Sequence, residues 1–381
     1  MIYLDYNATT PVAREVLDAM LPYFTDKFGN AASRTHLAGW EAAEGVEQAR
    51  QQVANLLGCE PAEIVFTSGA TEAINLALKG AFDALAESQG RKHIITVQTE
   101  HKAVLDSCRY LQEVRGAEVT YLGVDSQGHV EMQELAVAIR PDTLLVAMMY
   151  VNNETGLINP VKEVGAICRQ HGVLFFCDAV QAVGKIPVAP AALGVDMLAF
   201  SAHKIYGPKG VGALYIKKGT PLREQMSGGG HERKRRSGTL NVPGIVGLGQ
   251  AAGLVAEAMP QDMQRIARLR DHLEERLCHE LGEVYVNGDA QNRVAQVSNL
   301  LFKNIVAEDL LLALSTHVAI SSGSACTAAE VRPSHVLTAM HLPAEEALAS
   351  VRISLGRPTT EEEIDAAAGR IIAAVKQLRG A

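Results

Sequence analysis

The feature that most constrains this 381-residue chain is a regular alternation of short apolar runs with helix-length segments between residues 64 and 217. Most of the runs are apolar throughout, a pattern typical of strands that are covered on both faces of a sheet. The runs are IVFTS (64–68), HIITVQ (93–98), VTYLGV (119–124), LLVAMMYV (144–151), VLFFCDA (173–179), MLAFSA (197–202) and GALYIK (212–217). The alternation predicts an α/β fold with a seven-stranded, mostly parallel sheet between layers of helices.

The sequence changes in character after Gly249. A long amphipathic helix is expected at about 262–281. Short strands and a last helix follow it, at 283–288, 296–302, 318–322, 350–355 and from Thr360 onward. We therefore predict a large α/β domain over residues 16–259 and a smaller α+β domain formed by residues 1–15 and 260–381.

Composition excludes several classes of protein. With 48% hydrophobic and 20% charged residues, the chain can bury a large core, and its net charge of −8 argues against nucleic acid as a main partner. No uninterrupted apolar stretch of membrane-spanning length and no secretory signal is expected. The six cysteines contain no C-x-x-C pair, so neither a disulfide framework nor a metal site is predicted, and a cytoplasmic location is favoured.

Two charged residues follow successive strands of the predicted sheet. Asp178 ends the fifth strand, and Lys204 follows the sixth. In an open α/β sheet, ligands bind at the carboxyl ends of the strands. A buried lysine has a lowered pKa, so it can form an imine or transfer a proton. A buried aspartate requires hydrogen-bond donors or a cation beside it. The alternative role for Asp178 is to cap the helix that follows the strand. Pyridoxal phosphate requires such a pair, because the lysine binds its aldehyde and the acid keeps its pyridine nitrogen protonated.

Further residues at the strand ends agree with this cofactor. The expected phosphate cradle comprises Gly69, Ala70, Thr71, Ser201 and His203. His101, at the tip of the second strand, would lie flat over the ring. Taken one at a time, these residues also suit ordinary structural roles, such as a helix cap or a buried histidine. Their agreement on one ligand is what supports a pyridoxal phosphate site.

Three other segments allow more than one interpretation. Cys326 lies among small residues, typical of an exposed flexible segment, and its residues alone leave open whether this thiol is reactive. Arg352 is either an edge charge or a clamp for a carboxylate. The basic loop at 228–241 is more often a solvated face than an ordered anion site, and Asn153 in VNNETG also suits a plain turn.

Taken in order, these stretches resemble the NifS/IscS-type cysteine desulfurases of the class V aminotransferase superfamily. The matching stretches are YLDYNATTPV, FGNAASRTH, EIVFTSGATEAIN, TEHKAVLDSC, VNNETG, DAVQAVGK, SAHKIYGPKGVGALY, GGGHERKRRSGT, SSGSACT, PSHVL and RISLGRPTTEEEID, and they run through nearly the whole chain. SSGSAC is the most discriminating of them. It marks the branch whose catalytic cysteine lies on a longer mobile loop, here at about 321–332.

The resemblance implies a fold-type I pyridoxal phosphate enzyme that works as a homodimer. It also implies the conversion of L-cysteine to L-alanine, with the sulfur left on the enzyme as a persulfide for an acceptor such as an iron–sulfur scaffold protein. Lys204 would bind the cofactor covalently, and Asp178 would face its pyridine nitrogen. Gln181 would contact the phenolic oxygen, and His101 would stack on the ring as a catalytic residue.

The resemblance also assigns the remaining site residues. Those implied to bind the phosphate are Thr71, Ser201 and His203, with Thr239 reaching the phosphate of the other subunit. Asn153 and Arg352 would bind the substrate carboxylate. Cys326 would take the sulfur from the substrate and would then donate it to the acceptor. In that transfer Cys326 would also be a candidate transient ligand of an iron–sulfur cluster.

Two departures from the family and three alternatives accompany this interpretation. Ala202 stands where the family has glycine in its Ser-Gly-His-Lys run. The chain ends at KQLRGA, without the tail that helps many relatives dock the scaffold protein, which bears on that partnership and not on the chemistry.

The alternatives are a selenocysteine lyase or class V aminotransferase with the same cofactor site, a non-catalytic homologue, and a dinucleotide-binding oxidoreductase. An aminotransferase has no use for Cys326. A non-catalytic homologue would be expected to have lost Cys326 or Lys204, and both are present. A dinucleotide-binding oxidoreductase is disfavoured because no G-x-G-x-x-G follows the first strand.

Overall fold

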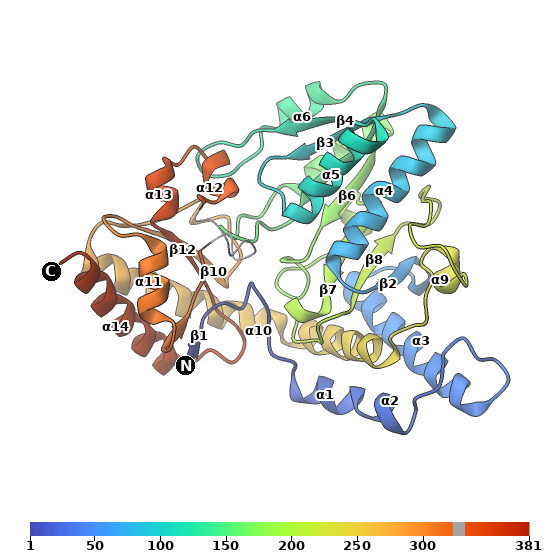
Figure 1. The fold of residues 1–381 in the computed structure, drawn as a ribbon, viewed down its shortest axis with the longest axis horizontal. Coiled ribbons are helices and arrows are strands. Elements are labelled where there is room, and N and C mark those ends of the chain that lie inside the picture. Colours follow the sequence, from blue (N-terminus) through green and yellow to red (C-terminus); the bar gives the residue numbers. More distant parts are fainter. Residues whose placement is uncertain (323–331, 381) are drawn as a thin grey trace.

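The computed structural model of the chain describes residues 1–322 and 332–380. Figure 1 shows a larger part built on one broad sheet and a smaller part beside it, with helix α10 (Val242–Leu281) running along both. The amino terminus lies with the smaller part, where β1 (Ile2–Tyr3) pairs in parallel with β11 (Val318–Ala319). The first residues of the chain therefore belong to the same part as the last ones.

In the described part of the chain, the central sheet has seven strands in the order β2-β8-β7-β6-β5-β3-β4. They are β2 (Ile64–Thr67), β3 (His93–Val97), β4 (Glu118–Leu122), β5 (Thr143–Met149), β6 (Leu174–Asp178), β7 (Met197–Ser201) and β8 (Gly212–Ile216). All of them run in the same direction except β8, which is antiparallel to both of its neighbours. Every strand predicted for this sheet is confirmed, with ends that agree to within two residues, whereas the strand predicted at 318–322 in the smaller part is the shorter β11, Val318–Ala319.

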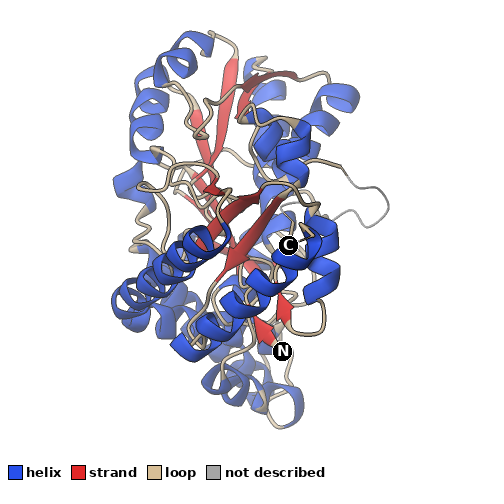
Figure 2. Cartoon of the chain, turned by 90° about the vertical axis from the view of Figure 1, so that its left-hand side faces the viewer, coloured by secondary structure: helices blue, strands red, loops and turns tan. Residues whose placement is uncertain are grey.

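Helices cover both faces of this sheet (Figure 2), which explains why its strands are apolar throughout. On one face lie α4 (Ala70–Gln89) and α5 (Lys102–Arg115). The other face carries α3 (Leu37–Leu57), α7 (Val161–His171) and the first half of α10. The glycine predicted to close the helix at 161–172 does so, because Gly172 has the left-handed backbone conformation (φ 61°) that few other residues adopt.

The larger part also contains several short elements. They are α1 (Arg14–Met20), α2 (Pro22–Thr25), α6 (Met132–Ala138), α8 (Pro190–Leu193) and α9 (His231–Lys234), with 3-10 turns at Pro61–Glu63 and Ala202–Lys204. The second of these turns follows β7 directly. It therefore fixes the direction in which the chain leaves the sheet at Lys204.

The smaller part is an antiparallel sheet with helices packed against it. Its strands are β9 (Val284–Val286), β10 (Val297–Phe302) and β12 (Ser350–Ser354), with β10 in the middle. Its helices are α11 (Ala307–Leu314), α12 (His335–Ala339), α13 (Ala344–Leu348) and α14 (Glu361–Leu378). The capping box predicted at Thr360 and Glu363 is confirmed at the start of α14, where each side chain accepts from the other residue's backbone N–H.

Helix α10 is longer than the sequence predicts. The expectation of a helix starting near residue 262 is wrong, because the helix starts at Val242 and continues through Pro260. Glycines and a proline lower helix propensity, but tertiary packing outweighs it here. A Cβ on Gly249 would lie 2.5 Å from the Cα of Ala49 in α3, so the glycine permits a close approach of two helices. The domain boundary predicted between residues 259 and 260 lies inside this continuous helix.

Among the described residues, α10 is the helix whose length and composition would allow it to cross a membrane. The expectation that no uninterrupted apolar stretch reaches that length still holds, because Gln250 and Glu257 interrupt the apolar residues of α10. Half of its most apolar window is buried inside the protein, where it packs against α3 and α1. The apolar character of α10 is therefore accounted for by its contacts with the core.

Candidate functional site

The residues predicted to bind the cofactor meet at one edge of the central sheet. Because β2, β3, β5, β6 and β7 point the same way, their carboxyl ends share this edge. The predicted residues that follow these strands in order are Gly69, His101, Asn153, Asp178 and Lys204. The topology therefore gathers five segments that are distant in sequence, as expected for a ligand site in an open α/β sheet.

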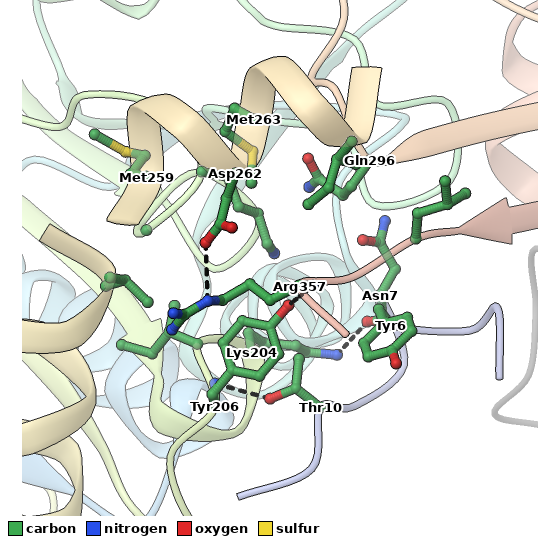
Figure 3. A pocket seen from close by; sticks show the side chains of 16 residues that line it. Tyr6, Asn7, Thr10, Lys204, Tyr206, Met259, Asp262, Met263, Gln296 and Arg357 are labelled. Carbon is green, nitrogen blue, oxygen red and sulfur yellow. Dashed lines mark hydrogen bonds and ion pairs between the residues drawn. The ribbon is translucent and has the colours of Figure 1, made fainter. Parts of the chain in front are cut away.

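Lys204 ends the 3-10 turn after β7 and is half-buried. Its Nζ donates hydrogen bonds to two backbone oxygens of the amino-terminal segment, that of Asn7 at 2.5 Å and that of Ala8 at 2.7 Å. Figure 3 shows this amine and Asn7 on the wall of one pocket. The amino-terminal segment, from the smaller part, thus sets the position of a lysine that belongs to the larger part.

Asp178 is buried at the end of β6, with 5% of its surface exposed. Burial raises the pKa of its carboxyl group, while the nearby His101 and Lys204 act to lower it. Its Oδ1 accepts a hydrogen bond from the backbone of Val180 at 3.0 Å. Residues 180–185 form successive turns, so the alternative role as a helix cap does not apply. Asp178 is instead a buried acid close to two basic side chains.

A second buried acid, Glu100, lies near Asp178 and was not predicted. Its side chain is fully buried, and its Oε1 accepts from the backbone of Met149 at 2.6 Å. Its Oε2 has no hydrogen-bond partner among the described residues. Burial, and then the charge of Asp178, raise the pKa of Glu100 well above its ordinary value. Burial and the neighbouring Asp178 therefore favour the protonated form of Glu100.

Gln181 lies in the turns after Asp178 and is also buried. Its amide nitrogen donates to the backbone oxygen of Asn7 at 3.0 Å, the same oxygen that accepts from Lys204. Its amide oxygen accepts from the Nζ of Lys185 at 2.5 Å. Neither Asn7 nor Lys185 was assigned a role from the sequence, although both lie in stretches that carry the resemblance.

The start of α4 has the properties of a phosphate cradle. No side chain of the described residues caps this helix at Gly69, so the backbone N–H groups of its first turn are available to an anion. Apart from the residues next to Gly69 in the chain, the nearest described atom to a Cβ built on Gly69 is Ser201 Oγ, at 3.9 Å. The space in front of the helix is therefore open. Ala70 is half-buried and Thr71 is exposed at the same place. The residues present therefore fit a phosphate group.

Two histidines follow strands at the same sheet edge, His101 after β3 and His203 after β7. His203 Nδ1 lies 3.2 Å from the hydroxyl of Thr9, and burial followed by the charge of Lys204 lowers the pKa of its imidazole to about 4. This histidine is therefore neutral at pH 7 and can donate one ring N–H. His101 begins α5 and is exposed, and its Nδ1 accepts from the backbone of Ala103 at 3.1 Å.

Ala202, where the family has glycine, is fully buried. A Cβ on Gly207 would lie 2.8 Å from the methyl group of Ala202. The extra methyl group is thus accommodated because residue 207 is a glycine. The backbone nitrogen of Ala202 still donates to the backbone oxygen of Val211 at 3.1 Å, so the turn that carries Lys204 is anchored to the residue that precedes β8.

Arg352 is buried on β12, which excludes the interpretation as an exposed edge charge. Its guanidinium donates to Asp5 at 2.9 Å, to the hydroxyl of Ser321 at 2.8 Å and to the backbone oxygen of Asn153 at 3.1 Å. The structure therefore brings the two predicted carboxylate-binding residues together, but through the Asn153 backbone. A substrate carboxylate would compete with Asp5 for this arginine.

The basic loop is held in place by two ion pairs. Arg236 contacts Glu72, in the first turn of α4, at 2.7 Å, and Glu232 forms a buried pair with Arg50 at 2.8 Å. The interpretation of this loop as a merely solvated face is therefore wrong. Thr239 is exposed at its end, and its expected contact is with another subunit.

Cys326, the predicted sulfur acceptor, lies outside the described residues, as do the neighbours on its loop. The five cysteines that are described form no disulfide bond. In the same described residues, no three His, Cys, Asp or Glu side chains are arranged to hold a metal ion.

The sequence model of the family described as Aminotransferase class-V matches residues 2–367. The chain belongs to the class-V aminotransferase family. A cysteine desulfurase IscS from Anaeromyxobacter sp. (strain Fw109-5) is 50% identical over 380 residues, which cover 99% of this chain and 93% of that relative. This class-V aminotransferase is thus similar to cysteine desulfurases over nearly its full length.

Solved structures of the family agree with this. A NifS-like protein superposes with a TM-score of 0.91 at 40% identity and covers 98% of both chains. SspA in complex with cysteine gives a TM-score of 0.83 at 37% identity, covering 94% of this chain and all of that one. The predicted resemblance to NifS/IscS-type enzymes and the predicted fold class are confirmed. Pyridoxal phosphate is the known cofactor of this family.

Proposed function

We propose that this chain is a pyridoxal phosphate-dependent cysteine desulfurase, which converts L-cysteine to L-alanine and takes the sulfur onto Cys326 as a persulfide. The observation that carries the proposal is the convergence of Lys204, the buried Asp178 and the uncapped start of α4 at one sheet edge. Relatives named cysteine desulfurase IscS, matched over 99% of the chain, support this choice of reaction.

Each site residue has a physical task toward the cofactor, which when bound supplies an electron sink for charge developing on the substrate. Lys204 holds it covalently, and Asp178 keeps its ring nitrogen protonated. The cradle residues described above hold its phosphate, with a neutral His203 as one donor. His101 covers the ring, and Gln181 contacts the phenolic oxygen.

The chain's own residues then move one proton and one sulfur atom. Lys204, once neutral and released, removes the proton from the substrate's α-carbon. The thiolate of Cys326 bonds to the substrate sulfur while the carbon–sulfur bond breaks, and that bond's electron pair stays with the carbon fragment. A proton delivered to that carbon completes alanine. The balance is cysteine plus enzyme thiol giving alanine plus enzyme persulfide.

The substrate carboxylate is assigned to Arg352 and Asn153. Arg352 is buried, and its Nε has no hydrogen-bond partner among the described residues. An arginine can bind a carboxylate with two parallel hydrogen bonds, so an exchange of Asp5 for substrate satisfies the same donors.

The enzyme is proposed to be a homodimer. The segment from α1 to the start of α3, at one end of the molecule in Figure 1, carries a patch of exposed apolar side chains. The patch comprises Leu17, Leu21, Phe24, Phe28, Leu37 and Trp40. Such a patch is typical of a protein interface. A second copy would cover it, and Thr239 of each chain would then serve the partner's phosphate.

The acceptor of the persulfide sulfur is proposed to be a protein such as an iron–sulfur scaffold, and the location is proposed to be cytoplasmic. The absence of disulfides among the described cysteines agrees with a reducing compartment. The principal alternative reaction is that of a selenocysteine lyase, which would use the same site.

The test is to incubate the purified protein, loaded with pyridoxal phosphate, with L-cysteine and a thiol reductant. Alanine and sulfide are expected in equal amounts, without a keto acid. Alanine released from selenocysteine but not from cysteine would favour the lyase. Amine transfer that depends on an added keto acid would contradict the proposal and favour an aminotransferase.

A further inference from the structure

Lys185 is a buried lysine that the proposed reaction leaves without a task. It is 9% exposed and lies in the turns that follow β6, four residues after Gln181. Burial lowers the pKa of its amine well below the ordinary value, and the charges of Lys204 and Arg352 add to this effect. Placing a lysine here costs free energy of desolvation, so its contact deserves an explanation.

The contact partner is the amide of Gln181, whose orientation follows from its two neighbours. The backbone oxygen of Asn7 can only accept a hydrogen bond, so the end of the amide that faces it at 3.0 Å is the NH₂ group. The opposite end, the oxygen, then faces Lys185 Nζ at 2.5 Å. Lys185 can donate to this oxygen whether its amine is charged or neutral.

The second N–H of the Gln181 amide is engaged by neither contact. A lysine on the oxygen side therefore fixes the amide so that it presents a donor, not an acceptor, to any ligand group beside it. Without Lys185, the contact with Asn7 alone would hold the amide in this orientation.

Lys185 borders a cavity with both apolar and polar side chains on its wall. Lys185 lines this cavity with Lys204 and the amide of Gln296, which is buried and has no hydrogen-bond partner among the described residues. Figure 3 shows Lys204 and Gln296 at this cavity. The space at its centre is about 20 Å³, enough for a water molecule. On its far wall, Asp262 pairs with Arg357 at 2.8 Å.

We propose that Lys185 is a positioning residue, which holds the Gln181 amide with its NH₂ group toward the phenolic oxygen of the bound cofactor. This inference rests on the proposed function, because Gln181 has this neighbour only when pyridoxal phosphate is bound. A donor at the phenolic oxygen stabilises its negative charge. It therefore lowers the pH at which the visible absorption band of the lysine-bound cofactor titrates.

The experiment is a spectrophotometric pH titration of the holoenzyme and its variants. Lys185→Met keeps the length of the side chain without its donor, whereas Lys185→Gln keeps a donor. The midpoint of the titration is expected to rise by about one pH unit in Lys185→Met, which corresponds to the loss of one hydrogen bond to a charged group. Lys185→Gln should stay close to the wild-type midpoint. A Gln181→Ala background should remove the effect of Lys185→Met, because the two changes act through one contact.

A second apolar variant guards against a folding defect in the first. Lys185→Ala leaves space that the adjoining cavity can fill with water, and an upward shift is expected there too. Unmoved midpoints in the folded apolar variants overturn the proposal, and so do equal shifts in Lys185→Met and Lys185→Gln. A wild-type protein that takes up no pyridoxal phosphate contradicts the proposed function itself, whereas a coloured protein with unmoved midpoints contradicts the role of Lys185 alone.

Discussion

Lys204 and Gln181 donate hydrogen bonds to the same backbone oxygen, that of Asn7, at 2.5 Å and 3.0 Å. Asn7 belongs to the amino-terminal segment, which is anchored in the smaller part through β1 and through the bond from its own N–H to Ser354 at 2.9 Å. The two parts of the molecule are therefore joined at the lysine proposed to bind the cofactor.

Replacing Lys204 with alanine tests the central step of the proposed function. The variant should be colourless after dialysis, because no amine remains to bind the cofactor covalently, and its rate should fall at least about a hundredfold. Absorption in the near-visible range and alanine production measure the two effects. Lys209→Ala, an exposed lysine five residues further along, is the matched control and should keep both. Equal colour in the two variants would contradict the assignment of Lys204.

The fold was largely predictable because its strands obey one simple pattern. A strand covered on both faces, such as β5, is apolar throughout and ends where a turn begins, so its bounds can be found from the sequence. Helix α10 was misjudged for the opposite reason. The glycines of α10 lower its helix propensity, so the sequence pattern does not indicate a helix there. Gly249 instead allows a close contact with α3, a segment about two hundred residues away in the sequence.

The site was predictable to the same extent. Residues that directly follow parallel strands, such as Asp178 and Lys204, share a sheet edge by topology alone. Asn7 could not be found in this way, because it contributes a backbone oxygen from a segment outside the sheet. Glu100 and Lys185 carried no pattern of their own, since only the fold shows that their side chains turn inward.

Replacing Cys326 with alanine separates cofactor binding from sulfur transfer. The variant should keep its visible absorption but release no sulfide in the presence of reductant, because the proposed acceptor thiol is gone. Cys59→Ala is the matched control, since burial, followed by Glu63 and Glu60, raises the pKa of the Cys59 thiol to about 12 and keeps it protonated. Persulfide labelling with an alkylating probe should mark wild type and Cys59→Ala alike. Undiminished turnover in Cys326→Ala would remove the persulfide step.

Glu154 gives the protein a pH-dependent stability. It is buried and accepts from the hydroxyl of Ser334, and burial is the main cause that raises its pKa from 4.5 to about 7. A raised folded-state pKa means that the folded protein keeps a proton that the unfolded chain loses. Stability from this group is thus full below about pH 4.5 and is lost as the pH rises to about 7.

The variant Glu154→Gln removes this titration while keeping the shape of the side chain. Relative to wild type, its free energy of unfolding should rise by up to about 3 kcal/mol between pH 4.5 and 7 and should stay level above that. Urea denaturation at pH 5, 6 and 8 measures the difference. Parallel stability profiles for the two proteins would show that Glu154 does not titrate in this window.

The contact between α10 and α3 predicts opposite effects for two glycines of one helix. A methyl group on Gly249 would lie 2.5 Å from the Cα of Ala49, and backbone atoms cannot yield as a flexible side chain can, so Gly249→Ala should destabilise the fold by about 2 kcal/mol. At Gly253, in the same helix, no described atom lies within 4 Å of the added methyl group beyond the helix itself. Gly253→Ala should therefore stabilise by about 0.5–1 kcal/mol through helix propensity and chain entropy. The midpoints of denaturant unfolding measure the stability of the two variants against wild type. A loss of stability at both positions would mean that glycine is needed for the backbone conformation of α10 and not for its packing.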